Sequence, residues 1–216
     1  VTDKNGIDIL ARELISHNIE ILSTGGTAKF LEENGILVKD VSEETGFPEI
    51  LNGRVKTLHP NIHGGILGRR NDANHVKKMQ EHNIIGIDLL IINLYKFTET
   101  IKKTHDNSKI IENIDIGGPA MIRAGAKNHE FVSVITDTND YTELTNQLKH
   151  NGSTTYNFRK YLAGKAFKLT SQYDLEISNW FSGYKEYTPQ LPETISIELQ
   201  KSLSMRYGEN PHQHAA

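Results

Sequence analysis

The chain has 216 residues, of which 37% are hydrophobic and 24% are charged, and its formal net charge is −3. This length suits one domain with a full hydrophobic core and an appended segment. The net charge argues against a general nucleic-acid binder. No apolar run approaches the roughly 18 residues that span a membrane. The absence of cysteine excludes disulfides, a thiol nucleophile and cysteine-ligated metals, and is compatible with a cytosolic setting.

The amino-terminal half alternates helical and extended patterns. Apolar spacing predicts helices at residues 8–17, 28–33 and 73–82 and strands at residues 19–23 and 36–41. Residues 42–48 are predicted to form a turn or short helix. The segment 52–63 is too rich in glycine, proline and polar residues to form a regular element.

The second half contains the strongest strand signal, at residues 88–94, where both faces are apolar as in a central parallel strand. Pro119 fits the first turn of a helix over 120–126. A further strand is predicted at 131–136, followed by helices at 141–150, after a cap at 138–140, and at 155–181. This alternation predicts an α/β protein with a three-layer parallel sheet flanked by helices. Ligands of such sheets bind at the carboxyl ends of the strands.

The motif Ser23-Thr24-Gly25-Gly26-Thr27-Ala28 lies between a predicted strand and a predicted helix. Backbone N–H groups and threonine hydroxyls at such a position can hold a phosphate. The alternative interpretation is a plain strand-to-helix turn that needs glycine for tightness.

The motif Gly53-Arg54-Val55-Lys56-Thr57-Leu58-His59-Pro60 combines cations with constrained residues. In an extended stretch Arg54 and Lys56 point to the same side and can converge on one anion, although a solvated basic loop is the usual outcome. His59 and His63 have zinc-like spacing, but Pro60 disfavours a helix there and no third ligand lies nearby. We therefore predict a site for a phosphorylated metabolite without a metal.

The motif Ile114-Asp115-Ile116-Gly117-Gly118-Pro119 is followed by Lys127-Asn128-His129. One interpretation places Asp115 and Lys127 on either side of a ligand, where a partly desolvated lysine exchanges protons. Alternatively, Asp115 caps a helix and Lys127 favours its negative end. Tyr95 follows the strongest strand, where it either reaches the site or seals the core.

Together these segments resemble the amino-terminal domain of the bifunctional purine-biosynthesis enzymes that combine AICAR formyltransferase and IMP cyclohydrolase. The resemblance covers residues 1 to about 185, and the Arg54 motif is its most specific part. Arg206-Tyr207-Gly208-Glu209-Asn210-Pro211-His212-Gln213 is similar to the start of the family's formyltransferase domain. Because the chain begins at Val1 and the rest of that domain is absent, we expect a longer natural protein. The resemblance divides the chain into a cyclohydrolase domain at 1–187, a linker at 188–204 and the start of the formyltransferase domain at 205–216.

The resemblance implies a methylglyoxal-synthase-like fold, a cytoplasmic homodimer, and closure of formyl-AICAR to IMP without metal or coenzyme. Formylation of AICAR with 10-formyltetrahydrofolate needs the missing domain. Lys127 is implied as the proton donor and acceptor, assisted by Lys56, Tyr95 and Asp115. The implied substrate contacts are Thr2, Asp3, Lys4, Thr24, Gly25, Gly26, Thr27, Arg54, Val55, Thr57, Asn93, Ile116 and Gly117. Arg206 and Tyr207 are implied to belong to the formyltransferase site.

Two residues depart from the family pattern, since Thr2 stands where serine is frequent and Lys96 replaces a proline after Tyr95. Two other functions suit the same fold. A lyase that eliminates phosphate from a triose phosphate needs a small closed pocket, which the long Arg54 loop suits less well. A nucleotide-sensing regulatory module needs a phosphate cradle but not the pair of Asp115 and Lys127.

Overall fold

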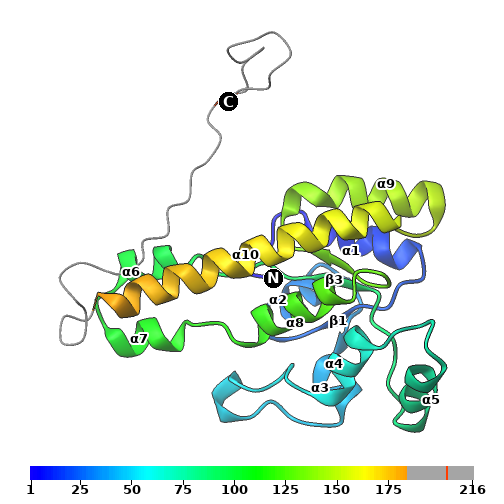
Figure 1. Cartoon of the computed structure of the whole chain (residues 1–216), viewed down its shortest axis with the longest axis horizontal. Coiled ribbons are helices and arrows are strands. Elements are labelled where there is room, and N and C mark those ends of the chain that lie inside the picture. Colours follow the sequence, from blue (N-terminus) through cyan, green and yellow to red (C-terminus); the bar gives the residue numbers. More distant parts are fainter. Residues whose placement is uncertain (184–202, 204–216) are drawn as a thin grey trace. The chain divides into compact units, whose positions relative to one another are not determined.

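The computed structural model describes residues 1–183 and residue 203 (Figure 1). Residues 1–177 form one compact unit, and a second unit begins at Ser178. The strands are β1 (Leu22–Ser23), β2 (Lys39–Asp40), β3 (Leu89–Ile91) and β4 (Ser133–Ile135). The helices are α1 (Ile7–Ser16), α2 (Gly25–Glu33), α3 (Val41–Thr45), α4 (Pro60–Leu67), α5 (Ala73–Glu81), α6 (Phe97–Lys103), α7 (Asn107–Glu112), α8 (Gly117–Lys127), α9 (Tyr141–Asn151) and α10 (Tyr156–Ser182), with short 3₁₀ turns at Leu51–Gly53 and Thr138–Asp140.

The strands pair in parallel, as the sequence predicts. Strand β1 pairs with β2, and β3 pairs with β4 with Leu90 opposite Val134. Each pair is connected by helices, α2 in the first and α6 to α8 in the second, as parallel neighbours require. The strands are shorter than predicted and form two separate two-stranded ladders. The N–H of Ile92 still donates to the carbonyl of Ile135 at 3.0 Å, which extends the second ladder by one bond.

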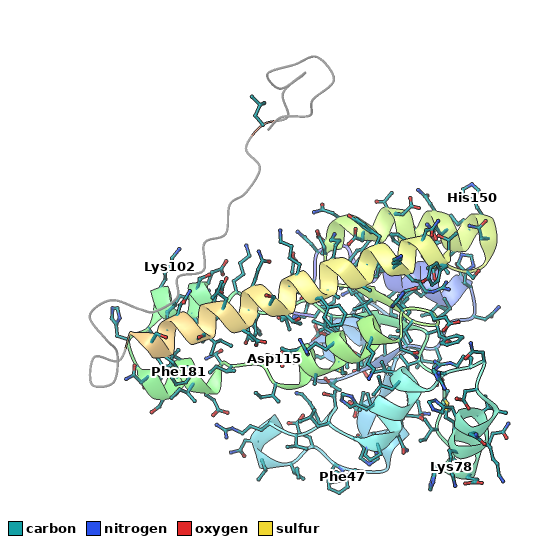
Figure 2. The ribbon with its side chains drawn as sticks, viewed as in Figure 1. Phe47, Lys78, Lys102, Asp115, His150 and Phe181 are labelled. Carbon is teal, nitrogen blue, oxygen red and sulfur yellow. The ribbon has the colours of Figure 1, made fainter. Side chains whose placement is uncertain are left out.

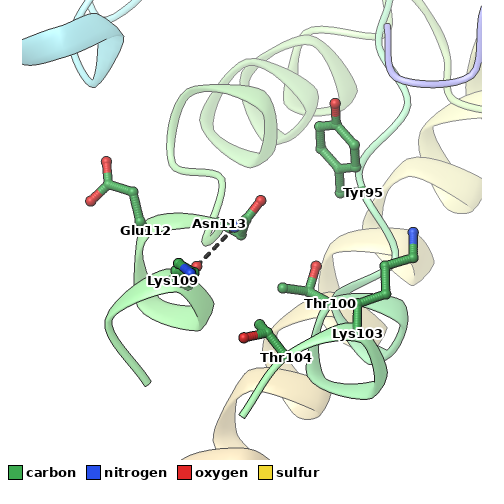
Figure 3. A pocket seen from close by; sticks show the side chains of 7 residues that line it. All are labelled: Tyr95, Thr100, Lys103, Thr104, Lys109, Glu112 and Asn113. Atoms are coloured by element: carbon green, nitrogen blue, oxygen red, sulfur yellow. Dashed lines mark hydrogen bonds between the residues drawn. The ribbon is translucent and has the colours of Figure 1, made fainter. Parts of the chain in front are cut away.

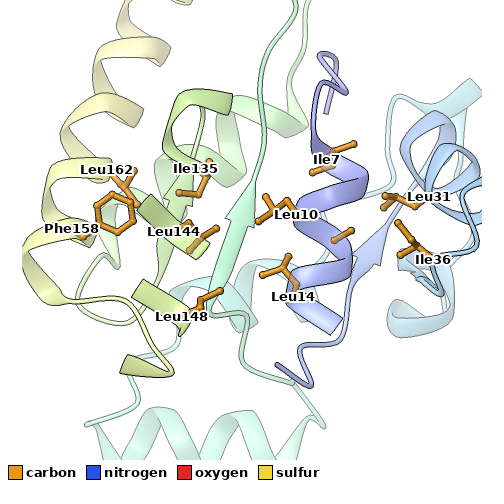
Figure 4. Close-up of a cluster of buried hydrophobic side chains, with 11 residues drawn as sticks. Ile7, Leu10, Leu14, Leu31, Ile36, Ile135, Leu144, Leu148, Phe158 and Leu162 are labelled. Carbon is orange, nitrogen blue, oxygen red and sulfur yellow. The ribbon is translucent and has the colours of Figure 1, made fainter. Parts of the chain in front are cut away.

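Hydrophobic cores lie on both faces of the second strand pair. Leu89 and Ile91 pack against one core and Leu90 against the other, as alternation along a strand requires. The first core collects side chains from α1, α2, α9 and α10 (Figure 4). The second core is formed mainly by α4, α8 and α10. Helices therefore cover both faces of the strands, which is the predicted layering.

Several helices begin and end at the residues that local signals predict. Asp72 caps α5 by accepting from the N–H groups of Asn74 and His75 at 3.0 and 3.3 Å. Gly152 ends α9 in the left-handed conformation. The predicted helices at 73–82 and 155–181 are confirmed within one residue at either end. None of the helices in the described part of the chain is long and apolar enough to cross a bilayer.

Several predictions about regular structure were wrong or incomplete. Residues 52–63 are not wholly irregular, because Pro60 begins α4 and His59 caps it, with its Nδ1 accepting from the N–H of Asn61 at 3.2 Å. Proline at a first helical position sacrifices no hydrogen bond, so the motif starts a helix. Helices α2 and α8 each begin three residues earlier than predicted, and α6 and α7 were not predicted. The predicted linker at 188–204 and the segment 205–216 lie outside the described residues, Leu203 excepted.

Candidate active site

The turn after β1 presents the start of α2. Thr24 is extended, and Gly25 lies in the left-handed region at φ +52°. Among the described residues, no side chain caps the first N–H groups of α2. Free N–H groups at a helix start, together with the positive end of the helix dipole, can hold an anion.

The amino-terminal segment is fixed against the chain after β3. The amide of Asn93 accepts from the N–H groups of Thr2 and Asp3 at 2.5 and 3.0 Å and donates to the carbonyl of Asp3 at 3.0 Å. The hydroxyl of Thr27 donates to the carbonyl of Val1 at 3.1 Å. Residues 1–3 therefore link the start of α2 to the carboxyl end of β3. Of the predicted binding residues, Thr2, Asp3, Thr27 and Asn93 are brought together.

The start of the Arg54 motif forms a hairpin, and Lys56 after it lies near Gly25 in the turn before α2. Ile50 and Val55 pair as an antiparallel bridge. The Lys56 ammonium lies 3.8 Å from the position that a Cβ of Gly25 would occupy, and it contacts Glu49 at 3.4 Å. Asp40, at the end of β2, has a pKa below its ordinary value because it accepts from Ser42, with a smaller contribution from Lys56. The cation of Lys56 thus lies at the strand ends.

Arg54 does not converge with Lys56 on one group. Its guanidinium donates to both carboxylate oxygens of Glu112 on α7, with Nε at 3.0 and 3.2 Å. The hydrogen bonds from Arg54 lower the pKa of the Glu112 carboxyl. Both side chains are more than half exposed, at 61% and 55%. Because an exposed ion pair contributes little free energy, a phosphate can displace Glu112 from Arg54.

Asp115 lies in the connection between α7 and α8 (Figure 2). Its carboxylate accepts from the N–H of Gly118 at 2.9 Å, so it does cap α8. Its own N–H donates to the Tyr173 hydroxyl at 2.8 Å. A Cβ on Gly117 would lie 2.7 Å from the Thr57 hydroxyl, which places the start of α8 directly against the Arg54 motif.

Lys127 lies at the opposite end of α8 from Asp115. The 11 residues of this helix span about 16 Å. Within one chain the structure does not bring the two side chains together. Lys127 instead occupies the last turn, where a cation favours the negative end of the helix dipole.

Tyr95 is 57% exposed and does not seal the core. It lines an open pocket of about 340 Å³ between the chain after β3 and helices α6 and α7 (Figure 3). The other lining residues are Thr100, Lys103, Thr104, Lys109, Glu112 and Asn113. Glu112 connects this pocket to Arg54. Among the described residues, no group of three or more His, Asp or Glu side chains is placed to hold a metal ion.

Sequence reasoning missed Glu112, Tyr173 and Asp40 as members of this region. Asp40 had a usable signal, because it ends a predicted strand at the edge where ligands bind. Glu112 and Tyr173 are each 58 residues from their partners, and no local pattern connects them. Arg206 and Tyr207 lie outside the described residues.

A family model that agrees with this fold identifies the class of protein. The MGS-like domain model matches residues 6–120, which is more than half of the chain. The chain therefore belongs to the MGS-like domain family. A second model, the AICARFT/IMPCHase bienzyme, matches residues 125–216.

Curated relatives within this class are bifunctional purine biosynthesis proteins. The chain is 54% identical over 216 residues to the bifunctional purine biosynthesis protein PurH of Brucella anthropi, and 56% identical over 218 residues to that of Brucella abortus strain S19. Each match covers the whole chain but only 40% of the relative. A crystal structure of ForH superposes with a TM-score of 0.74 at 34% identity, covering 83% of this chain and 94% of that one. These matches confirm the resemblance to the bifunctional purine-biosynthesis family.

Proposed function

We propose that this chain is an IMP cyclohydrolase, which closes the ring of formyl-AICAR to give IMP and water. The similarity to the bifunctional purine biosynthesis proteins PurH and the match to the AICARFT/IMPCHase bienzyme model support this assignment. The observation that carries it is the meeting of three distant segments, in which Lys56 adjoins Gly25 and Thr57 adjoins Gly117. This arrangement combines an anion site with a cation and a second helix start.

The substrate phosphate is assigned to the N–H groups at the start of α2, with Thr24 and Thr27 as hydroxyl donors. Lys4 and Arg54 are proposed as further cations of this site on the strength of the family resemblance, and Arg54 must leave Glu112 to contact the substrate. Asn93 organises the amino-terminal segment that closes one side. The remaining proposed contacts to the nucleotide are Thr2, Asp3, Gly25, Gly26, Val55, Thr57, Ile116 and Gly117.

Ring closure joins the carboxamide nitrogen to the formyl carbon of the same molecule, and the formyl oxygen then leaves as water. Holding both groups in a near-attack geometry can contribute about 7–11 kcal/mol. The Lys56 ammonium and the N–H of Gly117 are placed to stabilise the oxyanion that forms on the formyl group. Asp115 holds the amide, and Tyr95 assists proton transfer at the rim.

Lys127 is retained as the proposed proton donor and acceptor on the strength of the family resemblance. Its place at the far end of α8 supplies no geometric support within a single chain. The role of Lys127 is tested by comparing the cyclisation rates and IMP affinities of Lys127→Ala and Lys56→Ala. A Lys127→Ala variant that cyclises at the full rate and binds IMP normally would remove Lys127 from the mechanism.

The same proposal covers the rest of the protein. The cyclohydrolase domain extends over 1–187, the linker over 188–204, and a formyltransferase domain that uses 10-formyltetrahydrofolate begins at 205, with Arg206 and Tyr207 in its site. The cyclohydrolase itself needs no metal or coenzyme. The full protein acts as a cytoplasmic homodimer on small nucleotides, not on nucleic acid or membranes.

The decisive experiment mixes the chain with formyl-AICAR and follows the ultraviolet change on purine formation. Turnover that is lost in Lys56→Ala supports the proposal. Tight IMP binding without turnover would indicate a nucleotide-sensing module instead. Release of phosphate from a triose phosphate would indicate the lyase.

A further inference from the structure

We propose that Tyr173 is a positioning residue, whose hydroxyl holds Asp115 in the geometry that ring closure requires. The inference rests on the proposed function and deepens it. Tyr173 belongs to α10, a helix that contributes no other residue to the candidate site. Its hydroxyl accepts from the N–H of Asp115 at 2.8 Å across 58 residues of sequence.

The Tyr173 side chain is itself held firmly. It is only 5% exposed, and its ring meets Phe97 edge-on with 6.5 Å between the centroids. One helical turn further along α10, Glu176 accepts from the N–H of Thr98 at 3.3 Å. Contacts from α10 to the start of α6 therefore fix the hydroxyl in space. Burial raises the pKa of Tyr173, whereas the hydrogen bond from the Asp115 N–H lowers it by a smaller amount.

Two hydrogen bonds orient Asp115 in the connection before α8. The Asp115 carboxylate is oriented by the N–H of Gly118 at 2.9 Å, and its backbone is oriented by Tyr173. These two hydrogen bonds together set where the carboxylate points and where Gly117 lies against Thr57. Removing the Tyr173 hydroxyl leaves the first of them intact and releases the second. A small displacement of a reacting group is enough to slow a reaction by one to two orders of magnitude.

Tyr173→Phe removes one oxygen and keeps the ring that packs on Phe97. Tyr161→Phe is the matched control, because Tyr161 lies on the same helix, is 58% exposed, and has no hydrogen bond from its hydroxyl within the described residues. We expect kcat for cyclisation to fall roughly tenfold or more in Tyr173→Phe, with KM changed less than about threefold. The control should keep both constants. An unchanged kcat, or a raised KM with normal kcat, would overturn the proposal.

Amide hydrogen exchange separates this inference from the proposed function. Faster exchange at the Asp115 N–H in Tyr173→Phe than in wild type and in Tyr161→Phe supports the positioning contact, even in a chain that does not cyclise. Unchanged exchange at that N–H overturns the contact, whatever the activity. Absence of turnover in the wild-type chain instead counts against the cyclohydrolase assignment alone.

Discussion

Replacing Gly117 by alanine tests whether the Arg54 motif and the start of α8 lie against each other. The added Cβ would meet the Thr57 hydroxyl at 2.7 Å, whereas ordinary contact begins at 3.4 Å. Either the Thr57 side chain or the first turn of α8 must therefore move. Overpacking of this kind lowers the free energy of unfolding by about 1–3 kcal/mol.

Gly164, on α10, provides the matched control because a Cβ there meets no heavy atom within 4 Å. Gly164→Ala gains the preference of a helix interior for alanine, about 1 kcal/mol, whereas Gly117 is the first residue of α8 and gains less. The two variants show the direction of the effect, and removal of the Thr57 hydroxyl isolates the contact. Gly117→Ala should unfold more easily than Gly164→Ala by about 1–3 kcal/mol.

The assay is denaturant unfolding of both variants, with IMP affinity measured by calorimetry. We expect weaker IMP binding in Gly117→Ala and normal binding in Gly164→Ala. In a Thr57→Ala background Gly117→Ala should cost less stability than in wild type, since the clashing oxygen is gone. Equal stabilisation by both alanines would refute the juxtaposition of Thr57 and Gly117.

Three further predictions test other parts of the structure. Gly25→Ala and Gly35→Ala each place alanine at positive φ, +52° and +69°, and each should lower the free energy of unfolding by about 1–2 kcal/mol. Only Gly25→Ala should weaken IMP binding, and equal affinities in calorimetry would contradict the phosphate assignment. Lys165→Met removes the ion-pair partner of Asp137 and Asp140 and should destabilise the chain by about 1–3 kcal/mol at pH 7, allowing for solvent screening. A backbone N–H and then Lys165 lower the pKa of Asp137. The stability lost in Lys165→Met should therefore become smaller as the pH falls below 3.8, the ordinary pKa of an aspartate. Denaturation curves that show the same difference at every pH would contradict this prediction. Burial lowers the pKa of His63, so stability should fall as pH drops through 6.5, and His63→Leu should flatten that slope in thermal melts; an unchanged slope would exclude His63 as its source.

The elements that could be predicted are those fixed by local signals. The helices predicted at 155–181 and 73–82 match α10 and α5 to within one residue at either end, and Asp72 caps the start of α5. Helix α6 was not predicted because Phe97 and Ile101 are its only apolar residues, so it carries little apolar periodicity. The error at Pro60 came from treating proline as a helix breaker where it occupies a first helical position.

The candidate site could be predicted in part, because the carboxyl ends of parallel strands gather at one edge. That rule predicted Thr24 and Tyr95 at this edge. In the structure residues 1–3 link the start of α2 to Asn93 after β3, and the fold of the hairpin adds Lys56. The partners of Arg54 and Asp115 could not be predicted, since each contact depends on tertiary packing between segments 58 residues apart.

The claim that these separated segments form one nucleotide site is tested most directly by a crystal structure of the chain with IMP. The phosphate should accept hydrogen bonds from the N–H groups of Gly26 and Thr27, with the purine between Lys56 and Gly117. IMP bound instead between α6 and α7, against Lys103 and Lys109, would contradict the account.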